Sequence, residues 1–340
     1  MPKFVRFVMK QIPVKKDPKI MVKNLYFGIV PVTLYKPKAM SASLRKGIIF
    51  FHGGGMIFGS PDDYNNFCCY LSKETDLVVL SVGYRLAPEH NAIVGVNDCT
   101  AASIHFLKIL ETYGVDPFHV ILCGDSVGGT IVASVCQKFI TQPDLPKIRA
   151  HVMIYPYLQG LNFQLPSYQQ HKNVPFLSRD FSISCIFYSL DIHPSWKTAI
   201  LNGAHLPPAL REKYEKWMSV HNIPKSFKDR GYQYRSPDPF NEDAYQQNQH
   251  ILWPVNSPLI ADNDIIAQFP ETLLVSCEFD VLRDDVLLYK KRLEDQGVPV
   301  SWHHIEDAFH GVLLTFGGKY FSFPSSLKIV NVVVHFIKNL

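Results

Sequence analysis

The chain has 340 residues, 47% of them hydrophobic, and its 34 basic and 30 acidic residues leave a net charge of +4. This composition excludes a disordered chain, and so mild a charge without a basic block predicts no nucleic-acid partner. The seven cysteines are scattered without a C-x-x-C pair, which favours neither a disulfide framework nor a zinc site, and no apolar run is long enough to cross a membrane.

Residues 1–24 form a basic stretch in which seven lysines and arginines face one acid, Asp17. A basic amphipathic segment of this kind can associate with an anionic membrane surface. The alternative, which we favour, is a solvated helix that packs its apolar side on the domain. We assign residues 1–45 as a whole to an N-terminal segment that contributes to a cap, with one alternating strand at 32–36.

Buried strands and helices alternate through residues 46–155. The expected strands are short apolar runs at 47–51, 77–82, 119–122 and 149–154, and the expected helices span 62–75, 96–113 and 130–137. Such alternation predicts a mostly parallel sheet with helices on both faces. These residues therefore form the first half of an α/β core.

The first of these strands runs directly into His52-Gly53-Gly54-Gly55. Successive glycines leave backbone N–H groups unobstructed and able to approach a ligand closely. No Lys-Ser or Lys-Thr pair follows, so the loop is not a phosphate-binding loop. An HGGG loop supplies oxyanion-hole donors in lipases and esterases, whereas the alternative is a glycine turn with a structural role only.

The stretch Gly124-Asp125-Ser126-Val127-Gly128 fits the pattern G-x-S-x-G and lies between an expected strand and an expected helix. On so sharp a turn, a side chain at position 124 or 128 would collide with the neighbouring elements. The turn presents the Ser126 hydroxyl and directs the N–H groups of the following helix at any anion that develops. The alternative is a glycine-rich turn that only connects a strand to a helix.

The alternation breaks in residues 156–258, where prolines recur among aromatic residues and short helical patches. We interpret this region as an irregular helical insertion over the sheet, a cap or lid, and not as a second domain. Lids of this character exclude water from an active site and shape its pocket. The alternative is a structural extension without a role in substrate choice.

The α/β pattern returns in residues 259–340, the second half of the core. A strand at 271–280 ends in Asp280, and a helix at 284–296 is closed by Gly297. A last strand at 298–305 leads to a loop with His310, and a helix at 327–337 completes the fold.

The candidate catalytic residues Ser126, Asp280 and His310 lie at or just beyond strand ends, where open α/β sheets bind their ligands. Their order along the chain, serine then acid then histidine, is that of α/β-hydrolases. An imidazole can take the serine proton and return it to the leaving group, and a buried carboxylate orients the imidazole. The anion formed by the attack needs preorganised donors. The candidates for these donors are the N–H groups of Gly53, Gly54 and Val127.

Three other acids compete with Asp280 for the role beside the histidine. Asp284 and Asp285 begin a helix, where a carboxylate favours the helix dipole and caps the N-terminus, so a structural role is simpler for them. For Asp307 a hydrogen bond within the loop is the simplest explanation. We therefore predict Asp280 as the acid.

Five stretches together resemble the hormone-sensitive-lipase group of α/β-hydrolases and, within it, the arylacetamide deacetylases. They are His52–Gly55, Tyr84–His90, Gly124–Gly129, Phe279–Asp285 and Asp307–Gly311. The resemblance covers almost the whole chain and implies an α/β-hydrolase fold with a helical cap. It also implies a carboxylic ester hydrolase in which Ser126, Asp280 and His310 form the triad. The oxyanion loop implied by the resemblance is His52, Gly53 and Gly54.

Three positions depart from the pattern of that family. Val127 stands where the family usually has alanine, Ala308 where it usually has glycine, and Ala92-Ile93 where it usually has Phe-Pro. Valine keeps the N–H donor but adds bulk near the acyl group, and alanine at 308 would shift His310 if that position needs a positive φ. Members of the family normally carry an N-terminal anchor in the endoplasmic reticulum membrane, whereas this sequence contains no transmembrane segment.

The sequence thus predicts a serine hydrolase for small lipophilic acyl esters or arylacetamides, without a cofactor or a metal. The competing hypothesis is a ligand-binding protein of the hydrolase fold with weak or no turnover, because a fold alone does not grant activity. Inactive members usually lose a triad residue, and here all three are present.

Overall fold

The computed structural model of the protein describes residues 2–3, 6, 17–318 and 322–340. Most of the basic stretch at residues 1–24 lies outside them, so its association with a membrane surface stays a prediction. In the part of the chain that is described, no helix combines the length and the apolar character that crossing a bilayer requires.

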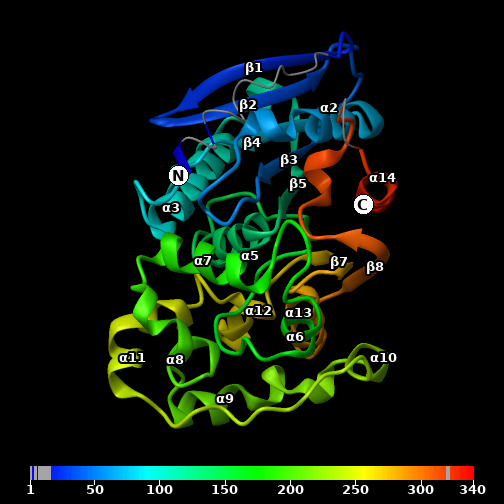
Figure 1. The fold of residues 1–340 in the computed structure, drawn as a ribbon. Coiled ribbons are helices and arrows are strands. Elements are labelled where there is room, and N and C mark those ends of the chain that lie inside the picture. The colour runs from blue at the N-terminus through cyan, green and yellow to red at the C-terminus, as the bar shows by residue number, and fades with distance from the viewer. Residues whose placement is uncertain (1, 4–5, 7–16, 319–321) are drawn as a thin grey trace.

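An eight-stranded sheet runs through the molecule in the order β1-β2-β4-β3-β5-β6-β7-β8 (Figure 1). From β4 to β8 neighbouring strands are parallel, whereas β1 and β2 form an antiparallel hairpin that pairs with β4. The mostly parallel sheet predicted from the sequence is confirmed. The strands are β1 (Ile20–Phe27), β2 (Val30–Pro37), β3 (Arg45–Phe51), β4 (Val78–Val82), β5 (Val115–Asp125), β6 (Ala150–Ile154), β7 (Glu271–Phe279) and β8 (Val300–Phe309).

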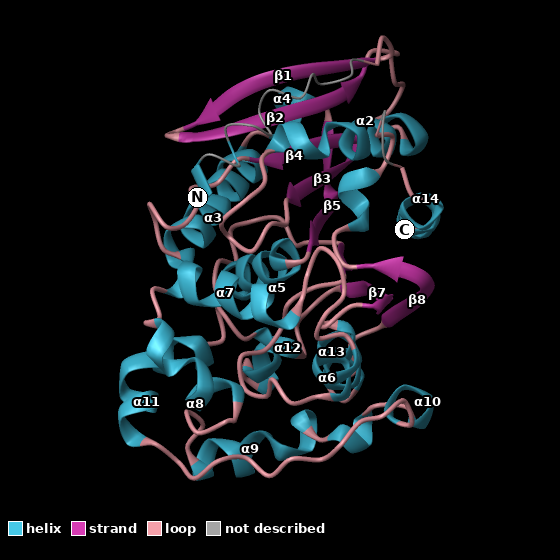
Figure 2. Ribbon diagram, in the orientation of Figure 1, coloured by secondary structure: helices cyan, strands magenta, loops and turns pink. Residues whose placement is uncertain are grey.

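Helices cover both faces of this sheet (Figure 2). One face packs against α2 (Asn65–Thr75) and α14 (Pro324–Asn339). The other face packs against α3 (Ala92–Lys108), α5 (Val127–Ile140) and α13 (Arg283–Glu294). Because both faces are covered, the central strands are apolar in succession and not in alternation; every residue of β4 is buried. The short helix α4 (Leu110–Tyr113) follows α3.

The register between β3 and β5 places two candidate loops side by side. Phe51 at the end of β3 pairs with Gly124 near the end of β5. Since the two strands are parallel, the loop that begins at His52 and the turn at Ser126 leave the sheet at the same edge.

The register between β7 and β8 places the predicted acid, Asp280, beside the predicted histidine, His310. Phe279 pairs with Phe309, and Asp280 and His310 are the residues that follow directly. The register shifts between Cys277 and Phe279, an irregularity of the kind that β-bulges use to redirect side chains. Asp280 and His310 therefore leave neighbouring strands at one level.

The insertion at residues 156–258 consists of short helices joined by irregular loops (Figure 1). Pro166 and Pro208 stand in the first turns of α6 and α9, where a missing N–H has no intrahelical partner to lose. After the insertion, α12 (Asn263–Ile266) leads back into β7. The helices of the insertion are α6 (Pro166–Gln170), α7 (Arg179–Leu190), α8 (Lys197–Leu201), α9 (Pro208–Met218), α10 (Lys225–Lys228) and α11 (Glu242–Asn248).

Within the N-terminal segment, residues 20–37 form β1 and β2, which extend the sheet. The contribution of residues 1–45 to a cap stays a prediction. Strand β1 is an edge strand whose central side chains are mostly exposed, so it carries lysine and lacks the apolar run that marks the buried strands. Sequence pattern alone therefore did not reveal it.

Candidate active site

Ser126 occupies the turn between β5 and α5 with a strained backbone, φ 54° and ψ −125°. A Cβ at Gly124 would lie 2.3 Å from the carbonyl oxygen of Gly128, and a Cβ at Gly128 would lie 2.1 Å from that of Phe51. Both distances are far below van der Waals contact, so the turn needs glycine at both positions. Strand and helix can then approach closely enough to hold the serine hydroxyl at the sheet edge.

The structure brings the three predicted side chains together. His310 Nε2 lies 2.8 Å from Ser126 Oγ, and His310 Nδ1 lies 2.8 Å from Asp280 Oδ2. The other carboxylate oxygen of Asp280 accepts a hydrogen bond of 2.8 Å from the Leu282 N–H, and Asp280 is fully buried. This geometry permits a proton to pass from the hydroxyl to the imidazole.

The three rival acids lie elsewhere, and each has its own partner. Burial raises the pKa of both Asp284 and Asp285, which lie in the first turn of α13. The carboxylate beside His310 is therefore that of Asp280. The partners are the Ser167 N–H at 2.7 Å for Asp284, the Gln159 amide at 2.9 Å for Asp285 and the Lys328 ammonium at 2.7 Å for Asp307.

Two residues expected in the oxyanion hole, His52 and Gly53, do not line the space beside Ser126. The His52 ring is fully buried and stacks on Tyr84, with ring centroids 4.2 Å apart, and burial lowers its pKa to about 4. The Gly53 N–H donates a hydrogen bond of 2.7 Å to Asp125. Both residues therefore hold the loop in place, and the Gly53 donor is already engaged.

Gly54, Gly55 and Val127 do line that space. Among the described residues, the N–H groups of Gly54 and Gly55 have no hydrogen-bond acceptor. Val127 begins α5, and the first N–H groups of a helix have no intrahelical acceptor. Gly55 was not among the predicted donors, although the third glycine of the run was a signal in the sequence.

Asp125 directly precedes Ser126 and connects several parts of the site. Its Oδ1 accepts the hydrogen bond from Gly53, and its Oδ2 accepts hydrogen bonds from the hydroxyls of Tyr64 at 2.8 Å and Tyr155 at 3.3 Å. Burial raises the pKa of this carboxyl from 3.8 to about 6, and the hydrogen bonds from Tyr64 and Gly53 oppose that rise. The sequence analysis gave Asp125 no role, although a carboxylate at the end of an apolar strand was a usable signal.

Ala308, where the family pattern has glycine, lies inside β8 and is fully buried. The strand continues past Ile305 to Phe309, so Asp307 and Ala308 are strand residues and not loop residues. Ala308 is not one of the described residues with a positive φ. The position therefore does not require glycine, and alanine there imposes no backbone strain.

A cavity of about 410 Å³ opens beside Ser126. The core contributes Gly54, Gly55, Val127 and neighbouring residues of the β–α loops to its lining. Helix α7 of the insertion contributes the opposite wall, because Phe181, Ser182, Cys185, Ile186, Ser189 and Leu190 all face the same cavity. The insertion is thus part of the pocket.

Aromatic side chains form part of the lining of this cavity. Phe176, which is 61% exposed and has φ 67°, stacks on Phe309 with ring centroids 4.8 Å apart. Phe58 and Phe181 form a second, tilted pair at 6.3 Å. Phe309 directly precedes His310, so the pair of Phe176 and Phe309 lies next to the candidate catalytic histidine.

The cavity is mostly apolar. No lysine, arginine or glutamate occurs among the described residues that line it, and its ionisable groups include Asp125 and His310. No group of three or more histidine, cysteine, aspartate or glutamate side chains in the described parts of the chain could hold a metal ion. The arrangement suits an uncharged ligand next to an activated hydroxyl.

Comparison with known proteins places this site in context. A family model described as the alpha/beta hydrolase fold matches residues 48–210 and 219–314. Human arylacetamide deacetylase-like 4 is 56% identical over 340 residues, which cover 100% of this chain and 84% of the relative. Bovine arylacetamide deacetylase is 37% identical over 308 residues, 88% of this chain and 76% of the relative.

Solved structures agree on the fold. Carboxyl esterase 2 from the fungus Tuber melanosporum superposes with a TM-score of 0.71 at 24% identity, covering 97% of this chain and 89% of that chain. A structure described as bacterial heroin esterase superposes with a TM-score of 0.72 at 21% identity, covering 99% of this chain and 89% of that one. The predicted α/β-hydrolase fold is confirmed.

Proposed function

The chain belongs to the arylacetamide deacetylase family of α/β-hydrolases, and on that basis we propose that it is a serine hydrolase of carboxylic esters. One observation carries the proposal. The side chains of Ser126, His310 and Asp280 form a continuous chain of hydrogen bonds that ends beside an apolar cavity.

In the proposed reaction, Ser126 Oγ attacks the ester carbonyl while His310 Nε2 takes its proton. Asp280 holds the opposite ring nitrogen, which selects the tautomer and stabilises the imidazolium that forms. His310 then protonates the leaving alcohol. It next takes a proton from the water that attacks the acyl-serine carbonyl, and returns this proton to Ser126 Oγ as the carboxylic acid is released. Proton donor and acceptor are already within hydrogen-bond distance in the structure.

The negative charge on the tetrahedral intermediate needs donors in place before the attack. We propose the N–H groups of Gly54, Gly55 and Val127, because all three residues line the cavity beside the serine. The loss of one such donor typically costs about 3 kcal/mol of transition-state stabilisation.

The proposed substrates are small, uncharged and lipophilic. The apolar lining provides no cationic partner for a charged substrate, and burying an unpaired charge is costly. Val127 narrows the space next to Ser126, which favours a short acyl group such as acetyl. The aromatic and aliphatic wall of α7 then holds the apolar alcohol portion, or the amine portion of an arylacetamide.

Labelling with a fluorophosphonate probe tests the proposal, because such probes react preferentially with an activated serine. We expect the parent to be labelled and peptide mapping to place the adduct on Ser126. In Ser126→Ala we expect no labelling and a loss of several orders of magnitude in kcat for an acetyl ester. Ser184→Ala, which changes a half-buried serine on α7 that does not line the cavity, is the matched control and should be labelled like the parent.

An adduct on another serine, or esterase activity that survives in Ser126→Ala, would contradict the proposal. A protein that binds lipophilic esters but neither turns them over nor reacts with the probe would support the competing hypothesis of an inactive binding protein.

A further inference from the structure

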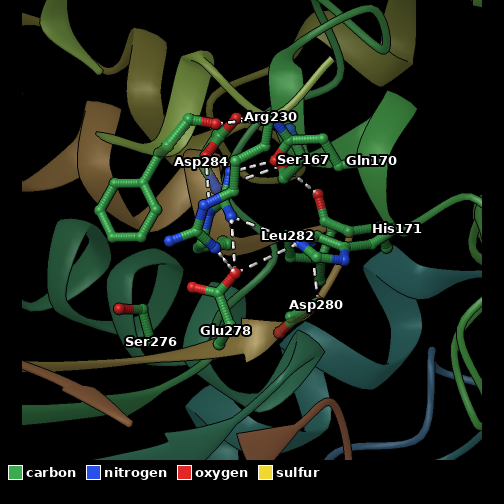
Figure 3. Close-up of polar contacts among 12 residues, drawn as sticks. Ser167, Gln170, His171, Arg230, Ser276, Glu278, Asp280, Leu282 and Asp284 are labelled. Atoms are coloured by element: carbon green, nitrogen blue, oxygen red, sulfur yellow. Dashed lines mark hydrogen bonds and ion pairs between the residues drawn. The ribbon is translucent and has the colours of Figure 1, made fainter. Parts of the chain in front are cut away.

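A buried polar cluster joins helix α6 of the insertion to the segment that carries the candidate acid (Figure 3). Its centre is Arg283, which is fully buried although its side chain is charged. We call it the Arg283 cluster. Its members are Ser167, Gln170 and His171 on or next to α6, Phe227 and Arg230 from the α10 region, and Glu278, Asp280, Arg283 and Asp284 from the core.

Residues of the insertion hold the guanidinium of Arg283 on more than one side. Arg283 Nη2 donates to Gln170 Oε1 at 2.9 Å, and Nη1 lies 3.3 Å from His171 Nε2. The guanidinium carbon lies 4.5 Å from the centre of the Phe227 ring. The core partner is Asp284, whose Oδ1 accepts from Nε at 3.0 Å. A buried charge is tolerated only with such partners, so the insertion and the core depend on each other here.

Ser167 makes the second connection, directly behind the candidate acid. Its hydroxyl donates to the carbonyl oxygen of Val281 at 2.7 Å, and its N–H donates to Asp284 Oδ2 at 2.7 Å. Val281 is the residue after Asp280. Inside this turn, the Leu282 N–H holds one carboxylate oxygen of Asp280, so the position of that oxygen depends on the path of the backbone from 280 to 284.

Glu278 makes the third connection, on the other side of Asp280. Its carboxylate forms an ion pair with Arg230 of the insertion and lies 3.4 Å from Arg283 Nη1. Its second oxygen lies 3.1 Å from His304 Nε2 on β8. The residues that flank Asp280 on both sides are therefore bound to the insertion.

From this geometry we propose that helix α6 positions the Asp280 carboxylate, with Ser167, Gln170 and Arg283 as the positioning residues. None of the three lines the cavity beside Ser126. They act through the 280–284 turn, and through it on the orientation of His310. The inference rests on the proposed function, and it adds that the insertion maintains the catalytic geometry as well as forming the pocket wall.

The test uses Ser167→Ala and Gln170→Ala, each of which removes one connection while Arg283 stays in place. We expect kcat for an acetyl ester to fall between about 10-fold and 100-fold, with KM within about threefold of the parent, because a misplaced acid weakens the chemistry and not the binding. Ser72→Ala is the matched control. This variant also removes a buried hydroxyl, which donates a hydrogen bond of 2.8 Å to the carbonyl oxygen of Leu77. Ser72 belongs to α2 and has no contact with the Arg283 cluster among the described hydrogen bonds, so the kcat of the variant should equal that of the parent.

Repeating the two substitutions in the Asp280→Asn variant distinguishes a specific effect on the position of Asp280 from a general loss of structural stability. In Asp280→Asn, the Ser167→Ala and Gln170→Ala changes should lower kcat no further, because the group they position is already gone. Equal losses in both backgrounds, or an unchanged kcat in the parent background, would overturn the inference.

If the buried variants do not fold, Arg230→Gln provides an alternative test of the inference, since the Arg230 side chain is half exposed and its replacement should not prevent folding. We expect a smaller fall in kcat with the same dependence on Asp280, and none for its neighbour Lys228→Gln, which binds only the Val220 carbonyl among the described residues. Equal kcat values for these two variants would count against the inference. Activity that survives Ser126→Ala would instead remove the proposed function itself.

Discussion

Val127 contributes two groups to the site that one substitution can separate. The N–H group points from the first turn of α5, and the branched side chain lines the cavity. In Val127→Ala the donor stays and the bulk next to Ser126 is removed. We expect kcat/KM for butyryl and octanoyl esters to rise relative to that for the acetyl ester, by up to about 1–3 kcal/mol in transition-state binding.

The measurement is kcat/KM for the three esters in the parent, in Val127→Ala and in Val127→Thr. Threonine keeps the β-branched shape of valine, so the threonine variant should keep the chain-length profile of the parent. If alanine also leaves that profile unchanged, Val127 does not limit the acyl group.

The buried carboxyl group of Asp125 should make the free energy of unfolding depend on pH. Burial raises its pKa in the folded protein from 3.8 to about 6, so between these values the folded state holds a proton that the unfolded state has lost. The stabilisation is complete below the unfolded pKa and is lost as the pH rises through the folded pKa. The shift corresponds to a loss on the order of 3 kcal/mol of unfolding free energy across that window.

Asp125→Asn removes this titration and keeps an oxygen that can accept the Gly53 N–H. Denaturant unfolding at several values between about pH 4 and pH 7 should therefore give a stability difference, variant minus parent, that increases with pH. Buried His52, with its pKa lowered from 6.5 to about 4, has the opposite pH dependence but is present in both proteins and cancels. A difference that stays constant with pH would show that Asp125 does not titrate in this way.

At the scale of elements, the parts that the sequence revealed are those with a local signature. Apolar runs marked the central strands, and the glycines at 124 and 128 marked the turn that holds Ser126. Edge strand β1 has no such run, because its side chains face solvent. The extension of β8 through Ala308 also has no local signal, since it depends on pairing with β7.

The loop at residues 52–55 shows why a sequence motif does not identify which backbone N–H groups act as oxyanion donors. The sequence places three equivalent glycines after His52, and only the fold decides which N–H is free. Asp125, 72 positions after Gly53, accepts the first of these N–H groups, which leaves the second and third beside the cavity. The Arg283 cluster was likewise not predicted, because its members Gln170 and His171 lie more than 110 positions before Arg283 in the sequence.

At the scale of the whole molecule, the core supplies the reacting groups and the insertion supplies a wall of the cavity and the contacts around Arg283. The two parts share buried charged groups, including Arg283, Asp284 and Glu278. Separating them would remove Gln170 from Arg283, the Ser167 N–H from Asp284 and Arg230 from Glu278, which leaves these buried charges with fewer partners. We therefore regard core and insertion as one structural unit around the site.

The lack of basic side chains in the described lining of the cavity also governs what happens after the ester bond is cleaved. Hydrolysis turns a neutral molecule into a carboxylic acid, which ionises at neutral pH, and no lysine or arginine among the described lining residues can hold that anion. The acid should therefore leave readily and re-enter poorly, so product inhibition is weak at neutral pH. Butyrate should inhibit more strongly at about pH 5 than at about pH 7, because more of it is neutral. Butanol, which does not ionise, is the control and should inhibit equally at both pH values. If the inhibition constant of butyrate is also the same at both pH values, ionisation does not drive the release of the acid.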